Sequence, residues 1–302
     1  MDQNDFDLDQ LVLKTSNLHC SSRSLSLSAD DDGAHEIAKC STVGKLISCK
    51  TLSSNLVRSI LYNIWKLEGR WTIREWGHHK YYIEFSSEED KKWVMDRRPW
   101  NISGGHLILK NRPLDVPLEE IDLSTTEVWV QAHGLPLNMV AATENAYKIG
   151  EGFWKTLEVD DRSGKLFSGT KYLRFKVEMQ ATSPLFAGFF ADNPRSKKAS
   201  KFWVQIKYER LSDVCYKYGL LGHEHRSCIA TSAATVTDLS GRTVALYGPW
   251  LKAKNTTALS CFKPSENPVR HPPFQNLPSY QTLSQINQVS TKNQRRFVCL
   301  VL

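Results

Sequence analysis

The sequence predicts an α+β fold, and three features point to it. Short apolar runs alternate with segments whose apolar residues recur at helical spacing. Two strand-like runs flank Gly77 in the manner of a hairpin. The chain has 302 residues, of which 41% are hydrophobic, with 9 Trp, 10 Tyr and 12 Phe, so it can bury a sizeable core. This length predicts roughly two domains of about 100 to 150 residues each.

The first folded unit is expected over residues 37–117. Its elements run in the order strand, helix, strand, strand, helix, strand, and they are expected at residues 43–47, 56–65, 71–73, 81–85, 88–95 and 107–109. Ser53 and Ser87 precede the two helices as N-caps would. This βαββαβ order is that of ferredoxin-like and RRM-like folds, in which two helices cover one face of a four-stranded sheet. The other face is expected to be free for a ligand or partner.

A second small α+β module is expected over residues 118–211. It contains an apolar strand around Trp129, a helix from about Ala141 to Ile149, and extended segments near residues 156–159, 172–177 and 202–208. The order of its strands does not follow from the sequence. A knuckle-like segment at 212–230 and a short segment at 231–262 come next, and the Pro-rich, polar residues 263–302 are expected to form a disordered tail.

Charge is distributed unevenly along the chain. Residues 1–36 hold eight acidic and two basic side chains, a net charge of −6. The whole chain has a net charge of +7, so residues 37–302 carry +13. The first 36 residues are polar with little periodicity and are expected to be a mostly disordered acidic arm. A basic body favours polyanionic partners, because lysine and arginine neutralise phosphates and release counterions.

The residues between Cys215 and Cys228 follow the spacing of a CCHC-type zinc knuckle, C-x2-C-x4-H-x4-C. Cys215, His223 and Cys228 occupy three of the ligand positions, and Tyr218 stands where the second cysteine is expected. Two thiolates on a tight turn, followed by a histidine and a third thiolate, form a tetrahedral Zn²⁺ site. Gly219 and Gly222 lie where the backbone must turn around the ion. The sequence therefore predicts a degenerate zinc knuckle.

Aromatic and basic residues in and before this segment are candidate nucleic-acid contacts. Aromatic rings stack on unpaired bases, and basic side chains contact phosphates. The candidates are Lys201, Lys207, Arg210, Tyr216, Lys217 and Arg226. For the neighbouring Trp203, burial in the core is the better interpretation.

Four segments together resemble plant proteins derived from non-LTR (LINE-type) retrotransposons. They are Tyr208–Lys217 with Gly222 and His223, Val43–Leu46, Trp129–Pro136 and Tyr247–Leu251, and they span residues 43 to about 254. In that family a domain of unknown function precedes a CCHC knuckle. The resemblance implies nucleic-acid binding, to RNA or single-stranded DNA, with zinc in the knuckle.

Tyr218 departs from the family pattern, and the departure concerns metal chemistry. A structural zinc site normally has four ligands, and a phenol with a pKa near ~10 is a poor substitute for a thiolate. His225 is one stand-in ligand, although it follows His223 by only two residues. The alternatives are a site that still binds zinc and a relic loop that does not.

No catalytic signature is present in the sequence. It lacks HExxH, nucleophile-elbow, dinucleotide-binding and kinase motifs, so we expect the protein not to be an enzyme. No run of about 18 apolar residues predicts a membrane helix. An acidic start and seven scattered cysteines favour an intracellular location, in the nucleus or cytoplasm. Cys299–Leu302 fits the prenylation pattern C-a-a-X, for which a chance match is the alternative.

The sequence thus favours a non-catalytic nucleic-acid-binding protein. The alternative is a protein–protein adaptor, or an inert relic, whose knuckle has no function.

Overall fold

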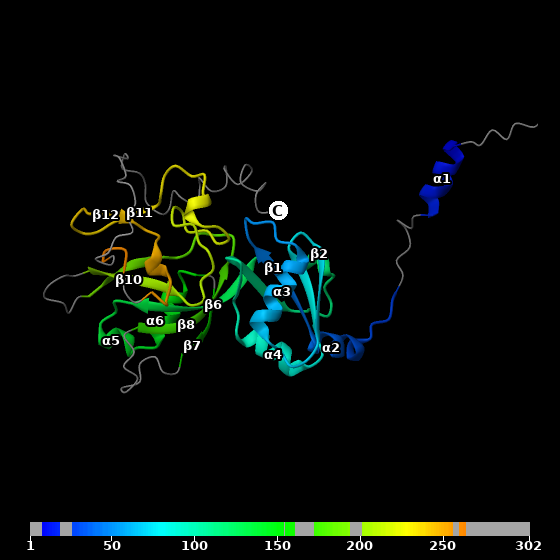
Figure 1. The fold of residues 1–302 in the computed structure, drawn as a ribbon, viewed down its shortest axis with the longest axis horizontal. Coiled ribbons are helices and arrows are strands. Elements are labelled where there is room, and N and C mark those ends of the chain that lie inside the picture. Colours follow the sequence, from blue (N-terminus) through cyan, green and yellow to red (C-terminus); the bar gives the residue numbers. More distant parts are fainter. Residues whose placement is uncertain are drawn as a thin grey trace, which may run out of the picture.

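The computed structural model describes residues 8–18, 26–153, 155–160, 172–193, 201–255 and 260–263. Within these ranges the chain forms two five-stranded antiparallel sheets and a separate two-stranded hairpin (Figure 1). Helices α3 (Ser54–Trp65) and α4 (Glu88–Asp96) belong to the first sheet unit, and α5 (Leu137–Val140) and α6 (Glu144–Gly150) belong to the second. The predicted α+β class is confirmed.

The first unit has the predicted ferredoxin-like topology. Its elements are β1 (Ser41–Ile47), α3 (Ser54–Trp65), β2 (Trp71–Gly77), β3 (Lys80–Phe85), α4 (Glu88–Asp96), β4 (Trp100–Ile102) and β5 (Gly105–Asn111). The strand order is β2-β3-β1-β5-β4, with all neighbours antiparallel. Without the short edge strand β4, this is the order of a βαββαβ sheet, in which the first and third strands are central.

Local sequence signals place the two helices of this unit. The side chain of Ser53 accepts a hydrogen bond from the backbone N–H of Leu56, and Ser87 accepts one from Asp90, as N-caps do. The apolar residues of both helices then pack on one face of the sheet. The resulting core includes Leu46, Val57, Leu61, Trp65, Tyr81, Ile83, Val94 and Leu107, all at most 2% exposed.

The second unit repeats the strand order of the first. Its elements are β6 (Thr125–His133), α5 (Leu137–Val140), α6 (Glu144–Gly150), β7 (Lys155–Val159), β8 (Tyr172–Gln180), β9 (Gly188–Asp192) and β10 (Lys201–Tyr208). The order β7-β8-β6-β10-β9 is the order of the first sheet, strand for strand along the chain. The helices differ: α5 and α6 together take the place of α3, and residues 181–187 join β8 to β9 without a helix, whereas α4 joins β3 to β4. The helix predicted near 141–149 corresponds to α6, and the separate short helix α5 precedes it.

The expectation of a free sheet face in the first unit is wrong. Val43, Ile47 and Ile108 lie on the face away from α3 and α4, and each is at most 4% exposed, within the core of the second unit. His106 on the same face is 1% exposed and bonds to Thr126 of β6, with Nε2 2.8 Å from the threonine Oγ1. The core of the second unit therefore extends onto this face of the first sheet, while the residues under α3 and α4 form a separate core.

The acidic arm contains helices where disorder was predicted. Helix α1 covers Leu8–Leu18 and α2 covers Asp31–Lys39, so the prediction is wrong for residues 8–18 and 31–36. Asp30 caps α2 by accepting a hydrogen bond from the Gly33 N–H. The acidic residues in the first turn stabilise the helix through their interaction with the positive end of its dipole. The predicted disordered tail, apart from Lys263, and the prenylation sequence Cys299–Leu302 lie outside the described residues.

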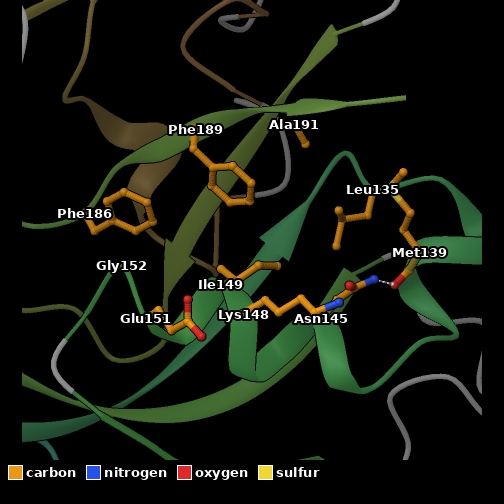
Figure 2. A pocket seen from close by; sticks show the side chains of 10 residues that line it. All are labelled: Leu135, Met139, Asn145, Lys148, Ile149, Glu151, Gly152, Phe186, Phe189 and Ala191. Atoms are coloured by element: carbon orange, nitrogen blue, oxygen red, sulfur yellow. Dashed lines mark hydrogen bonds between the residues drawn. The ribbon is translucent and has the colours of Figure 1, made fainter. Parts of the chain in front are cut away.

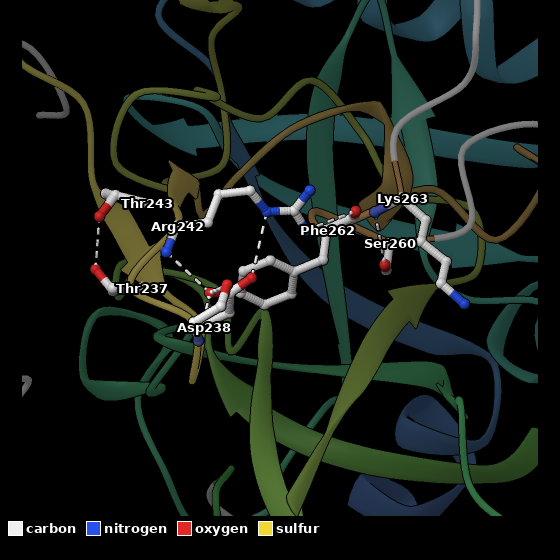
Figure 3. Close-up of polar contacts among 8 residues, drawn as sticks. Thr237, Asp238, Arg242, Thr243, Ser260, Phe262 and Lys263 are labelled. Atoms are coloured by element: carbon white, nitrogen blue, oxygen red, sulfur yellow. Dashed lines mark hydrogen bonds and ion pairs between the residues drawn. The ribbon is translucent and has the colours of Figure 1, made fainter. Parts of the chain in front are cut away.

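A small hairpin follows the knuckle. It consists of β11 (Thr235–Thr237) and β12 (Thr243–Ala245). Asp238 accepts hydrogen bonds at its turn from the backbone N–H groups of Ser240 and Arg242, at 3.0 and 2.9 Å. Arg242 in turn donates to the Asp238 carboxylate and to the carbonyl of Phe262, which ties the hairpin to the segment at 260–263 (Figure 3). Three short 3₁₀ turns complete the assignment: Leu118–Glu120, His225–Ser227 and Pro249–Leu251.

Candidate metal and nucleic-acid site

The knuckle begins with a tight backbone turn after β10. Val214 and Leu221 form an antiparallel bridge, and the Cys215 N–H donates to the Leu220 carbonyl at 2.8 Å. The Gly219 N–H donates to the carbonyl of Cys215 at 2.7 Å, which closes the turn. These bonds hold Cys215 at the start of the turn, in a fully buried position.

The turn brings the three predicted metal ligands together. The ligand atoms of Cys215, His223 and Cys228 all lie within 4.8 Å of one another. A tetrahedral Zn²⁺ with bonds of about 2.3 Å would hold its ligand atoms about 3.8 Å apart, so a contraction of about 1 Å at most would close the site. Two sulfur donors and one imidazole suit zinc. The cluster therefore fits a metal with three protein ligands.

Tyr218 lies at the fourth position of the cluster. Its hydroxyl is 2.9 Å from Nε2 of His223. Burial raises the pKa of Tyr218 well above the ordinary phenol value, and the neighbouring thiols raise it further. The phenol is therefore neutral near pH 7 and does not provide the anionic ligand of an intact knuckle. His225 is not in the cluster; its ring stacks on Tyr216, with centroids 5.5 Å apart and planes at 20°.

Burial also sets the proton state of the ligands in the metal-free site. It raises the pKa of the Cys215 thiol and lowers the pKa of the His223 imidazole. Both groups are then neutral near pH 7. Zinc binds the thiolate, so loading this site must release protons.

The knuckle is held between the two sheet units. On the side of the second unit, the Leu185 N–H donates to the carbonyl of Gly219 at 2.9 Å. Gly219 and Gly222 have positive φ values of 82° and 97°. A Cβ at Gly219 would lie 2.4 Å from the Tyr247 ring, and one at Gly222 would lie 3.1 Å from the Ile47 side chain. The carbonyl of Gly222 accepts from the N–H of Cys49 in the first unit at 2.9 Å. Glycine is therefore required here for close packing as well as for the turn.

Three of the six predicted nucleic-acid contacts lie in the knuckle. Arg226 is exposed in the 3₁₀ turn at 225–227. Tyr216 is half-buried and stacks on His225. Lys217 turns inward: its Nζ donates to the carbonyl of Cys228 at 3.2 Å and also to that of Ala230, so it fastens the end of the knuckle.

The other three lie on β10 and just beyond it, apart from each other. Lys207 is 2% exposed, and its Nζ donates to the carbonyl of Asn255 at 2.9 Å; burial lowers its pKa. Its predicted role as a surface contact is therefore not supported. Lys201 is exposed, 3.9 Å from Asp192. Arg210 is exposed, and its guanidinium lies 5.9 Å from the centre of the Trp100 ring.

One charged cluster was not predicted from the sequence. A cavity of about 200 Å³ between the units is lined by Arg98, Arg174, Arg210, Asp96, Glu209, Trp129 and Pro99. Arg174 stacks on Trp129 at 3.7 Å and forms ion pairs with Glu209 and Asp160, at 2.8 and 2.9 Å. Only Trp129 (β6) and Arg174 (β8) lie in strands; the others come from the end of α4, the residues just after it, and the residue pair after β10. Only the tertiary fold brings these segments together, so no local signal in the sequence reveals the cluster.

Comparison with protein families gives one match. Residues 35–117 match the model of a domain of unknown function, DUF4283. The match covers the first sheet unit and leaves the second unit and the knuckle outside it. No protein with a curated description is similar in sequence.

Among solved structures, the chain is similar to the RNA-binding domain of Hrp1 in complex with RNA. The identity is 9%, the TM-score is 0.23, and the alignment covers 46% of this chain and 81% of that one. So low a score adds nothing to the topology already described. No helix in the described part of the chain is long and apolar enough to cross a membrane.

Proposed function

We propose that this protein binds single-stranded nucleic acid, RNA or DNA, without catalysing a reaction. One observation carries the proposal: the Cys215–His223–Cys228 cluster is assembled in a knuckle that exposes Arg226 and presents the stacked pair Tyr216 and His225. A cation beside stackable rings is the usual means of holding an unpaired strand. The charge of +13 on residues 37–302 adds long-range attraction for phosphates.

We further propose that the chain derives from a non-LTR retrotransposon and acts inside the cell, in the nucleus or cytoplasm. The knuckle spacing and the order of the four resembling segments support the descent. The cysteines among the described residues, Cys40, Cys49, Cys215, Cys228 and Cys261, are all free thiols, which supports a reducing compartment.

Zinc would be held by Cys215, His223 and Cys228. The fourth coordination position would be either open or occupied by the Tyr218 hydroxyl. Bound there, the ion would fix the turn that carries Tyr216 and Arg226. Its role would be structural, because it would tie Cys215 at the start of the turn to Cys228 at the end of the knuckle.

The test is fluorescence anisotropy with a labelled single-stranded RNA and a labelled single-stranded DNA. Arg226→Ala should weaken binding about three- to tenfold, since it removes one exposed phosphate contact. The matched control is Lys201→Ala, which removes an exposed charge at the start of β10, outside the knuckle, and should have the smaller effect. No binding to any single strand, or equal losses in both variants, would reject a knuckle-centred interface.

A second function is favoured by Tyr218: a protein–protein adaptor, or a relic in which the knuckle is only a packing element. Tyr218 removes one thiolate, and close packing of Gly219 against Tyr247 and of Gly222 against Ile47 holds the loop by protein contacts alone. If nucleic-acid binding appears only when Tyr218→Cys restores the ligand set, the natural chain is a relic.

A further inference from the structure

The second sheet unit has a vacant helix position. In the first unit, α4 packs Val94 and Met95 into the core. Trp93 of α4 also stacks on Trp100 of the edge strand β4, with ring centroids 5.7 Å apart and planes at 23°. In the second unit β9 takes the place of β4, but residues 181–187 form no helix between β8 and β9.

An apolar groove lies beside this helix-free connection, with Phe186 and Phe189 on one side of it (Figure 2). It has a volume of about 470 Å³ and runs between the helices α5 and α6 and the edge strand β9. Asn145, Lys148 and Glu151 supply its polar lining. Its apolar lining is Leu135, Met139, Ile149, Phe186, Phe189 and Ala191. The groove is therefore suited to the apolar side of an amphipathic helix.

The N-terminal arm carries such a helix. Leu8, Leu11 and Val12 of α1 are spaced i, i+3 and i+4, so they share one side, and they are 68%, 45% and 62% exposed. An isolated helix of 11 residues is marginal in water, and packing of its apolar side is what usually stabilises it. The arm carries a net charge of −6 and the rest of the chain +13, so attraction between arm and body favours docking.

We propose that helix α1 of a second copy of this chain occupies the groove of the second sheet unit. Figure 1 shows α1 and α2 at the end of the molecule opposite to α5 and α6. Residues 19–30 between the two helices span at most about 40 Å when extended, and α1 would have to pass both sheet units to reach its own groove. Mutual exchange of α1 between two copies gives a closed symmetric dimer without a bridging partner. This inference is independent of the proposed function.

The test is the mass of the full-length chain in solution, measured by light scattering after size exclusion over a range of concentrations. We expect a dimer whose dissociation constant rises at least tenfold in Leu11→Asp, on the apolar side of α1, and in Ala191→Arg, in the groove. Two matched controls should leave the dimer unchanged: Leu13→Asp, on the opposite side of α1, and Leu137→Asp, on α5 outside the groove lining. Both control positions are exposed, at 67% and 81%.

A mixing experiment separates loss of docking from loss of folding. Leu11→Asp keeps an intact groove and Ala191→Arg keeps an intact α1, so the two monomeric variants should form a heterodimer when combined. If the natural chain is a monomer at all concentrations, the proposal is wrong. Docking of α1 into the groove of its own chain would give this same monomeric mass and would also contradict the proposal. A dimer that resists both variants, or a mixture that stays monomeric, would overturn it as well.

Discussion

The Tyr218 hydroxyl lies 2.9 Å from Nε2 of His223, so the residue at the position of the missing thiolate is hydrogen-bonded to a ring nitrogen of a metal ligand. Binding of a metal through Nε2 requires this bond to break. Tyr218 therefore affects the site in two ways. It replaces one negatively charged ligand, and its hydroxyl competes with the metal for Nε2 of His223. The state of the knuckle depends on this pair.

Restoring the thiolate should convert the cluster to a four-ligand zinc site. In Tyr218→Cys we expect one equivalent of tightly bound zinc and a rise in the melting temperature on metal addition, because binding to the folded state alone stabilises it. Tyr218→Phe is the control, since it removes the hydrogen bond to His223 without adding a ligand. Metal analysis of the purified proteins is the measurement; equal zinc contents in Tyr218→Cys and Tyr218→Phe would contradict the expectation.

Gly219 should be far less tolerant of substitution than another glycine of similar backbone angle. Gly219→Ala adds a methyl group 2.4 Å from the Tyr247 ring at a φ of 82°, and it should cost about 2 to 4 kcal/mol. Gly241→Ala has a φ of 84° and no atom within 4 Å of the new Cβ, so it should cost about 1 kcal/mol. Urea unfolding compares the two. Equal losses would mean that backbone strain alone decides the cost.

His106 should make the protein less stable in weak acid. Burial lowers the pKa of His106 to about 4, against an ordinary value near 6.5. Above pH 6.5 the imidazole is neutral in both the folded and the unfolded chain. Between pH 6.5 and 4 only the unfolded chain takes up the proton, so the free energy of unfolding falls, by up to roughly 3 kcal/mol.

Urea unfolding between pH 7.5 and 4.5 measures this dependence. His106→Gln removes the titrating group and should flatten the curve over this range. His133, whose pKa burial also lowers to about 4, should account for part of the remaining slope. An unchanged slope in His106→Gln would show that His106 does not stay neutral in the folded protein.

Arg174 should not be replaceable by lysine. Its guanidinium pairs with both Glu209 and Asp160 and stacks on Trp129, and lysine keeps the charge but loses the planar fork. Arg174→Lys should cost about 2 kcal/mol in the free energy of unfolding, whereas Lys201→Gln, which breaks an exposed pair with Asp192, should cost less than about 0.5 kcal/mol. Similar losses in the two variants would contradict the structural role of this cluster.

Local sequence signals predicted the first unit except for the short edge strand β4, which was missed. Ser53 and Ser87 cap the helices where their positions predict, and the run of strands and helices around Gly77 has the expected order. The sequence also contains a signal that both faces of the first sheet are buried. Leu107, Ile108 and Leu109 are consecutive and apolar, and neighbouring residues in a strand point to opposite faces, so both faces had to be covered.

The order of the second sheet and the state of the basic residues were not predictable in the same way. β6 pairs with β8 and β10, which are distant along the chain, and this pairing depends on tertiary packing. Lys207 looks like a surface cation by type, but it lies in a strand whose inner residues are covered by the segment around Asn255. The knuckle ligands were predictable because a metal site depends on spacing along one short segment.

The most direct test of nucleic-acid binding is its dependence on salt. We predict that affinity for a labelled single-stranded RNA falls by about tenfold or more between 50 and 200 mM salt, as expected for about three phosphate contacts, and that Arg226→Ala reduces the slope of the log–log plot by about 0.7. The same affinity at both salt concentrations, or no binding at the lower one, would contradict the account.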